Sequence, residues 1–264
     1  MLLAAPLVAT GVVTAGPAVA SPSAAGAAAT PLQRWLAAST VRIAHRGGSA
    51  NWPEASPRAY ANATAWSPDL ALEFPARRTA DGVWVGSEEA STGRVFGRDL
   101  VIAQSTWAQL STLRSTVGNQ PLSRLQQTVL AKLPADRIVF VDDKDDAYVD
   151  QLLNLVDRYG GKGRTVVKSY FQFTSTPATA RARGYTTWGY FYEANMGQFA
   201  AEQGKFDLLG MQYDASATTF RTMLGTGKRV IAHIVSTDAQ ADAGLAKGAT
   251  GLMVSGVKQV VPRG

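Results

Sequence analysis

The sequence predicts an α/β protein that folds as a (β/α)8 TIM barrel, a single domain with a small insertion after its second strand. Short apolar runs alternate with helical stretches such as 148–159, a pattern typical of repeated strand–helix units and a parallel sheet. Eight runs fit strands, at residues 41–45, 69–74, 137–142, 164–169, 186–192, 207–213, 229–235 and 250–255. Eight such strands in a chain of 264 residues indicate the barrel. A doubly wound open sheet usually has fewer strands and a Gly-rich phosphate loop, which this sequence lacks.

The connection after the second predicted strand is long. Residues 76–104 contain Gly82-Val83-Trp84-Val85-Gly86, which fits an extra strand or hairpin. A helix is expected next, near residues 105–114. Long insertions of this kind are usually functional.

The N-terminal residues 1–20 carry no charge and end in Ala18-Val19-Ala20, a small-x-small pattern typical of signal-peptide cleavage. A membrane anchor is the alternative, but Gly16-Pro17 interrupts the apolar run, which is also short for a span. Residues 21–31 consist only of Ala, Ser, Gly, Pro and Thr and predict a flexible spacer before a barrel domain at 32–264. We therefore expect a secreted, extracellular protein with its signal peptide removed near Ala20, and no stable membrane insertion.

The chain contains no cysteine, so an exported form takes no stability from disulfides. Lys and Arg number 26 against 20 Asp and Glu, a net charge of +6. This balance favours anionic partners such as phosphate esters, lipid headgroups or wall polymers. A solvated basic surface would give the same balance. Because no run of Lys and Arg is interleaved with aromatic residues, we expect no nucleic-acid partner.

Polar residues stand at the ends of most predicted strands. They are His45, Glu73, Asp142, Lys144, Lys168, Tyr170, Tyr192, Glu193, Gln212, Asp214, His233 and Ser255. In a TIM barrel the active site lies at the C-terminal ends of the strands. Polar groups that end apolar strands are expected in a cleft and are costly in a core. The functional site is therefore predicted among these residues.

The first strand ends in His45-Arg46-Gly47-Gly48. A histidine in this place can act as an acid or a base near neutral pH. Arg46 offers a planar fork of donors suited to phosphate oxygens. The two glycines let a ligand or a neighbouring loop approach the backbone. A rim histidine followed by a tight turn is the structural alternative.

Further motifs follow His45-Arg46-Gly47-Gly48-Ser49 in order. They are Pro53-Glu54, Leu72-Glu73, Thr79-Ala80-Asp81-Gly82, Asp142-Asp143-Lys144, Lys168-Ser169-Tyr170 and Gly248-Ala249-Thr250-Gly251. This order resembles the glycerophosphodiester phosphodiesterase family of phospholipase-C-like TIM barrels. The resemblance covers most of residues 40–256 and is clearest over the first fifty of them.

The resemblance implies a metal-dependent hydrolase of small phosphodiesters, in which two histidines share acid–base work and carboxylates hold Mg²⁺ or Ca²⁺. By position, His45 and Arg46 would be catalytic, and Arg46 would also contact the phosphate. Glu73 and Asp142 would bind the metal, and Lys144 would neutralise phosphate charge. Carboxylate oxygens suit a hard cation, and positive groups stabilise charge in the transition state.

Departures from the family pattern fall on the site itself. Pro75 stands where the family has the second Asp of Glu-x-Asp, which removes a metal ligand and predicts weaker metal binding. Glu88 stands where the family has its second catalytic histidine. Glu88 could act as a general acid or as a replacement ligand, or it could be a solvated loop carboxylate. Asp142 replaces a Glu and is shorter by one methylene.

Four further side chains are predicted to contact the substrate: Lys168, Tyr170, Tyr192 and His233. His233 could face the pocket in place of the lost histidine, or it could be a core histidine bonded to a backbone carbonyl. The neighbouring aromatic residues Trp188, Tyr190, Phe191 and Tyr213 could line the pocket or contact a choline-like headgroup. Core packing is the more ordinary explanation of these residues.

The acidic segment 142–146 has two interpretations. Its four carboxylates could bind a cation at the strand end, or some of them could cap a helix that starts near Ala147. Strand alternation places Asp142 and Lys144 on the pocket side and Asp143 on the other.

The resemblance, together with the uncharged N-terminal segment, implies an exported phosphoric diester hydrolase that acts on glycerophosphodiesters or related phosphodiesters from lipids or wall polymers. The alternative is a barrel that kept His45, Arg46 and Lys144, lost turnover and serves as an extracellular binding protein for phosphate esters or other anions. A lipid-directed phosphodiesterase or lyase is a third possibility, although those relatives also use two histidines.

Overall fold

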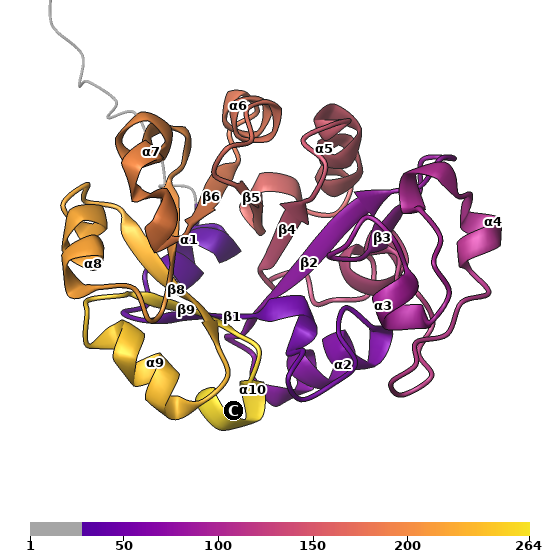
Figure 1. The fold of residues 1–264 in the computed structure, drawn as a ribbon, viewed down its shortest axis with the longest axis horizontal. Helices are drawn as coiled ribbons and strands as arrows, with labels where there is room; N and C mark the ends of the chain where they lie inside the picture. Colours follow the sequence, from indigo (N-terminus) through magenta and orange to yellow (C-terminus); the bar gives the residue numbers. More distant parts are fainter. Residues whose placement is uncertain (1–27) are drawn as a thin grey trace, which may run out of the picture.

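The structure is a computed structural model that describes residues 28–264 (Figure 1). The predicted signal peptide and most of the predicted spacer lie outside the described residues. Eight parallel strands follow one another around a closed sheet. They are β1 (Val41–Ala44), β2 (Ala71–Arg78), β4 (Val139–Asp143), β5 (Thr165–Tyr170), β6 (Thr186–Phe191), β7 (Leu208–Gln212), β8 (Arg229–Val235) and β9 (Gly251–Val254). Because β1 pairs with both β9 and β2, the sheet closes and the predicted (β/α)8 barrel is confirmed.

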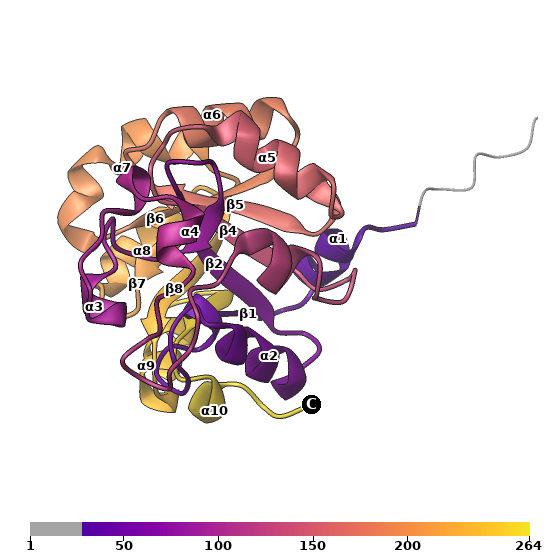
Figure 2. The same ribbon diagram turned by 90° about the vertical axis from the view of Figure 1, so that its right-hand side faces the viewer.

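Helices lie around the outside of the strands, as Figures 1 and 2 show from two directions. They are α2 (Pro57–Trp66), α5 (Val149–Asp157), α6 (Ser175–Ala182), α7 (Met196–Glu202), α8 (Ala217–Leu224), α9 (Asp238–Leu245) and α10 (Val257–Val260). The six-residue segment Leu125–Leu130 forms a π-helical turn before β4. Within residues 28–264, no helix is long and apolar enough to cross a bilayer.

Strand alternation divides the apolar residues into two layers. Side chains such as Phe74, Val141 and Leu209 face outward and pack beneath the helices. The other set fills the barrel interior and includes Ile43, Ala71, Phe140, Val166, Trp188, Ile231 and Met253. Two residues further along β2, β4, β5 and β8, the same inward face carries Glu73, Asp142, Lys168 and His233. The period of two therefore places a polar layer directly above an apolar one.

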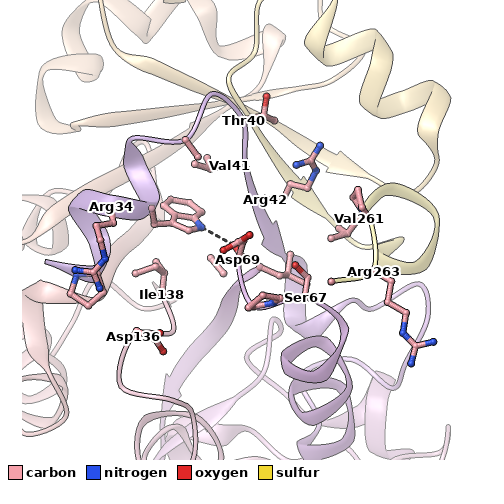
Figure 3. A pocket seen from close by; sticks show the side chains of 18 residues that line it. Arg34, Thr40, Val41, Arg42, Ser67, Asp69, Asp136, Ile138, Val261 and Arg263 are labelled. Atoms are coloured by element: carbon pink, nitrogen blue, oxygen red, sulfur yellow. Dashed lines mark hydrogen bonds between the residues drawn. The ribbon is translucent and has the colours of Figure 1, made fainter. Parts of the chain in front are cut away.

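The N-terminal end of the barrel is closed by α1 (Pro31–Leu36). Thr30 and Gln33 form a capping box at its start, so the helix begins at the last residue of the predicted spacer. Trp35 packs edge-on against Phe140 and donates to the carbonyl of Asp69 at 2.9 Å. Beside α1 lies a cavity of about 520 Å³ (Figure 3). It opens where β1, β2 and β4 begin, at the end of the barrel opposite the predicted site.

The insertion after β2 contains β3 (Trp84–Gly86), α3 (Gly93–Phe96) and α4 (Trp107–Leu110). β3 pairs antiparallel with β2, so the predicted extra strand is present. The helix predicted near 105–114 is the single turn Trp107–Leu110, because the chain beyond it forms an antiparallel bridge between Arg114 and Pro121. The insertion carries its own small core of Val85, Ile102, Leu110, Leu113 and Leu122.

Candidate active site

A small cavity of about 50 Å³ opens at the C-terminal ends of the strands. Its lining is His45, Arg46, Glu88, Lys144, Lys168, Trp188, Tyr190, Tyr192, His233, Ile234 and Met253. Seven of the side chains predicted from the sequence as catalytic or substrate-binding therefore meet in one place. The remaining one, Tyr170, is not part of this lining and packs against Phe171, Phe173 and Tyr190.

The backbone of the turn after β1 packs closely against neighbouring side chains. Arg46 adopts φ 51° and Gly48 φ 93°, and the amide of Arg46 donates to Glu73 Oε2 at 2.5 Å. A Cβ on Gly47 would lie 2.9 Å from Ala59 in α2, and one on Gly48 would lie 2.8 Å from Trp52. The glycines thus admit neighbouring side chains of the protein itself, and no bound ligand is needed to explain them.

His45 lies at the base of the cavity and is 5% exposed. Its Nδ1 is buried and has no hydrogen-bond partner among residues 28–264. Burial, together with the positive charges of Lys168 and Arg46, holds the pKa of His45 well below its usual value. The imidazole is therefore neutral at neutral pH and can accept a proton.

Three carboxylates, those of Glu73, Glu88 and Asp142, each place an oxygen within 4.8 Å of the others. Glu73 and Asp142 are completely buried. Such a group of oxygens could hold a metal ion. Pro75 is the partner of Asp142 in the pairing of β2 with β4, so β2 offers no carboxylate at that point.

Two lysine ammonium groups lie among the same oxygens. Lys168 Nζ is 3.0 Å from Glu73 Oε1 and 2.8 Å from Asp142 Oδ2. Lys144 Nζ is 2.7 Å from Glu88 Oε1 and 3.2 Å from Asp142 Oδ2. Burial opposes both charges, but the adjacent carboxylates outweigh it and raise the pKa of each lysine. As arranged, the three carboxylates are paired with cations of the protein and do not fit a divalent ion unless Lys168 moves away.

Glu88 is a paired side chain of the pocket, so the alternative of a solvated loop carboxylate is wrong. Its Oε2 also lies 3.1 Å from Arg46 Nη2, a close charge contact without hydrogen-bond geometry. Burial raises the pKa of Glu88, but Lys144 and Arg46 more than offset it and lower the pKa to about 2. The carboxylate is therefore ionised at neutral pH, which disagrees with the predicted role as general acid.

One wall of the cavity is aromatic and comes from β6 and the residue that follows it. Trp188, Tyr190 and Tyr192 alternate inward, and each ring meets His233 edge-on, with centroids 6.1, 6.1 and 5.5 Å away. His233 Nε2 is 3.1 Å from the carbonyl oxygen of Phe191. Burial and Lys168 lower the pKa of His233 to about 4. His233 therefore lines the pocket and is bonded to a backbone carbonyl, and its service in place of the lost histidine stays a prediction.

The acidic segment after β4 divides as alternation predicts, with Asp142 inward and Asp143 outward. Asp143 accepts a hydrogen bond from Thr176 Oγ1 at 2.5 Å. Asp146 accepts from the amide of Thr176 at 2.7 Å and from the two amides before it, at the start of α6. The expectation that these carboxylates cap the helix after Ala147 is wrong, because α5 begins at Val149 with no side-chain cap and Asp146 serves α6.

Although Pro53-Glu54 is one of the motifs, no pattern in the sequence predicts that Glu54 and Arg94 support Arg46. Glu54 lies 3.5 Å from Arg46 and accepts from Arg94 Nη1 at 2.9 Å. Arg94 also pairs with Glu89, which places Glu89 outside the pocket. The sequence indicates Tyr190 only as a member of an aromatic group. Its inward position, between Trp188 and Tyr192 on alternate residues, was readable from the strand period.

Comparison with known proteins agrees with this architecture. A sequence model of the Glycerophosphoryl diester phosphodiesterase family matches residues 45–196, which is more than half of the chain. The chain belongs to this family. The predicted family is thereby confirmed, and with it the prediction of a phosphodiesterase-type enzyme at the level of the family.

Solved structures with the same fold include proteins of this family. A putative glycerophosphoryl diester phosphodiesterase from Agrobacterium tumefaciens superposes with a TM-score of 0.73 at 18% identity, over 83% of this chain and 94% of that one. A phosphodiesterase from Oleispira antarctica, solved with its product sn-glycerol-3-phosphate, gives 0.71 at 14% identity, over 82% and 93%. A glycerophosphodiester phosphodiesterase from Thermotoga maritima gives 0.67 at 18% identity, over 83% and 96%. At these identities the likeness establishes the fold.

Proposed function

We propose that this member of the Glycerophosphoryl diester phosphodiesterase family hydrolyses glycerophosphodiesters or related phosphodiesters from lipids or wall polymers. The observation that carries the proposal is the convergence of His45, Arg46 and Lys144 on one cavity at the C-terminal rim of the barrel. The sn-glycerol-3-phosphate bound to the Oleispira antarctica phosphodiesterase supports a small phosphodiester as the substrate class.

The proposed reaction uses groups of this chain. The neutral His45 takes a proton from an attacking water, whose oxygen forms a new bond to phosphorus. The bond to the leaving alkoxide breaks, the alkoxide takes a proton from solvent water, and the His45 imidazolium releases its proton to solvent, which yields an alcohol and a phosphomonoester. Arg46 and Lys144 stabilise the negative charge that develops on the phosphoryl oxygens.

Mg²⁺ or Ca²⁺ is the ion that an all-carboxylate donor set favours, and Glu73 and Asp142, with Glu88, are the residues that would hold it. A bound ion would polarise a phosphate oxygen. The site lacks a ligand at Pro75, and Lys168 shares two of the three carboxylates. We therefore assign no step of the reaction to an ion.

The test is release of alcohol from a panel of glycerophosphodiesters, with and without chelator. His45→Ala should lower kcat by about 10²–10⁴, the usual contribution of a general acid–base group. Asp150→Asn is the control, since Asp150 pairs with Arg183 on the outer helices, away from the cavity and its supports. Unchanged turnover in the His45 variant would remove the basis of the site assignment.

A binding protein without turnover is the second candidate. The position of Glu88 favours it, because Glu88 stands in the place of a histidine and pairs with both Lys144 and Arg46. Such a protein would bind sn-glycerol 3-phosphate in calorimetry while the whole diester panel stays inert. The double variant Pro75→Asp, Glu88→His would then be expected to gain hydrolysis.

Export is part of the proposal and rests on the uncharged segment that ends in Ala18-Val19-Ala20. Expression of the full chain in a secreting host should give a mature protein in the medium that begins at Ser21. Mass spectrometry of the purified N-terminus measures this directly. Protein that stays in the cell with residues 1–20 attached would contradict export.

A further inference from the structure

We propose that Lys168 takes the place of a divalent cation in this site, so that its ammonium group is the fixed positive charge between Glu73 and Asp142. The phosphate ester would then bind without a divalent ion. Binding of the ester without an ion rests on the proposed function. Replacement of the ion by Lys168 concerns only the ion and the side chains of this chain.

The backbone places Lys168 at the centre of the carboxylate group. In the pairing of β4 with β5, Asp142 and Lys168 are direct partners, and alternation points both side chains into the barrel. The ammonium lies 2.8 Å from one buried carboxylate and 3.0 Å from the other. It therefore bridges Glu73 and Asp142 as an ion would.

Aromatic packing holds the ammonium in this position. Lys168 Nζ lies 5.3 Å from the ring centroid of Trp188 and 5.0 Å from that of Tyr190, within the range of a cation–π contact. The residue is 5% exposed. A displaced Lys168 would have to carry its charge past these rings, or lose it among buried apolar groups.

The charge balance of the site leaves no place for an added dication. Three carboxylates (Glu73, Glu88 and Asp142) face three cations (Arg46, Lys144 and Lys168). A divalent ion binds carboxylate oxygens at about 2.0–2.6 Å. At that distance it would compete with Lys168 for the same two oxygens and add two positive charges to a neutral, buried group.

The experiment is calorimetric titration of the full chain with MgCl₂ and with CaCl₂, in the absence of any ester. Wild type should show no binding below about millimolar concentrations. Lys168→Met keeps the length of the side chain, removes the charge and leaves Glu73 and Asp142 without that partner. Its affinity for the ion should rise at least about tenfold, and its Tm should rise on addition of the ion through linkage.

Lys205→Met is the matched control. Lys205 pairs with Glu202 outside the cavity, so this variant should titrate like wild type. Tight, micromolar binding of either ion by wild type would overturn the proposal. Equal affinities of wild type and Lys168→Met would overturn it too.

A measurement on wild type keeps the proposal falsifiable if Lys168→Met does not fold. Inorganic phosphate is titrated with EDTA present and again with Mg²⁺ or Ca²⁺ added. The affinity for inorganic phosphate should be the same within about twofold in the two titrations. A tenfold higher affinity for phosphate in the presence of the ion would contradict the inference. An inert diester panel would remove the proposed hydrolysis but leave the ion titration standing, so the two failures are distinguishable.

Discussion

Buried His233 should make the stability of this protein depend on pH in a way that one substitution reveals. Its pKa is lowered to about 4 by burial and by Lys168, whereas an unperturbed histidine titrates near 6.5. Between pH 4 and pH 6.5 the histidine is therefore mostly protonated in the unfolded chain and mostly neutral in the folded protein. The contribution of His233 to stability is therefore fully present above pH 6.5 and is lost as the pH falls toward 4.

The magnitude follows from the size of that window. About 2.5 pKa units correspond to about 3 kcal/mol of unfolding free energy. In His233→Gln the side-chain amide can still donate to the carbonyl of Phe191, and the titrating group is gone. The difference in unfolding free energy between wild type and this variant should therefore shrink by about 3 kcal/mol as the pH falls from 7.5 to 4.

Asp143 supplies a control with the opposite sign. Burial raises its pKa to about 6, with hydrogen bonds from Thr176 and the amide of Asp145 opposing the shift. Because its folded pKa lies above the unfolded value of about 3.8, Asp143 destabilises the fold above pH 6 and does so less as the pH falls toward 4. The unfolding free energy of wild type minus that of Asp143→Asn should therefore rise by about 2 kcal/mol as the pH falls from 7.5 to 4. The same difference for His233→Gln should fall.

The assay is urea unfolding of wild type and both variants at fixed pH values from 7.5 to 4, followed by tryptophan fluorescence. Each comparison is a difference against wild type, so titrating groups shared by both proteins cancel. A difference between wild type and His233→Gln that stays constant over this range would refute the reasoning. Parallel curves for both variants would refute it as well.

Two further perturbations test the packing of the barrel. Arg137 is buried and donates to three backbone carbonyls at 2.7, 2.7 and 3.1 Å, so Arg137→Met should lower the unfolding free energy by about 3 kcal/mol or more in urea unfolding. A loss below about 1 kcal/mol would show that these bonds are replaced by water. Gly189→Ala would place a Cβ 2.4 Å from the ring of Phe206 and should lower Tm, whereas Gly197→Ala in α7 meets nothing within 4 Å and should leave Tm unchanged or raise it. Equal Tm values for the two glycine variants would contradict the packing argument.

The strands of the barrel were predictable because each is a short apolar run that most often ends in a polar residue. The inward and outward sides of Asp142 and Asp143 followed from alternation alone. The helix near 105–114 was predicted too long, because its length is decided by the bridge between Arg114 and Pro121 and not by local composition. That some carboxylates of segment 142–146 cap the next helix is one of two interpretations of the sequence; Asp146 instead caps α6, whose Thr174 to Thr176 lie about thirty residues further along the chain.

The site was predictable as a set of residues but not as a set of pairs. The strand ends named His45, Glu73, Lys144 and Lys168, yet no local pattern shows which charge meets which. Glu73 and Lys168 are 95 positions apart and meet only because β2, β4 and β5 are neighbours in the closed sheet. For the same reason the pKa values of these groups were beyond prediction, since each depends on partners from other strands.

The position of Glu88 between Lys144 and Arg46 has a consequence for ligand exchange. An incoming phosphate cannot simply add to two free cations, because it must replace the carboxylate that already occupies them. Binding then exchanges one anion for another and leaves the number of paired charges almost constant. The affinity should accordingly change little with ionic strength, unlike that of an open cluster of lysines and arginines. Selection at such a site depends on the shape of the ligand more than on attraction at a distance.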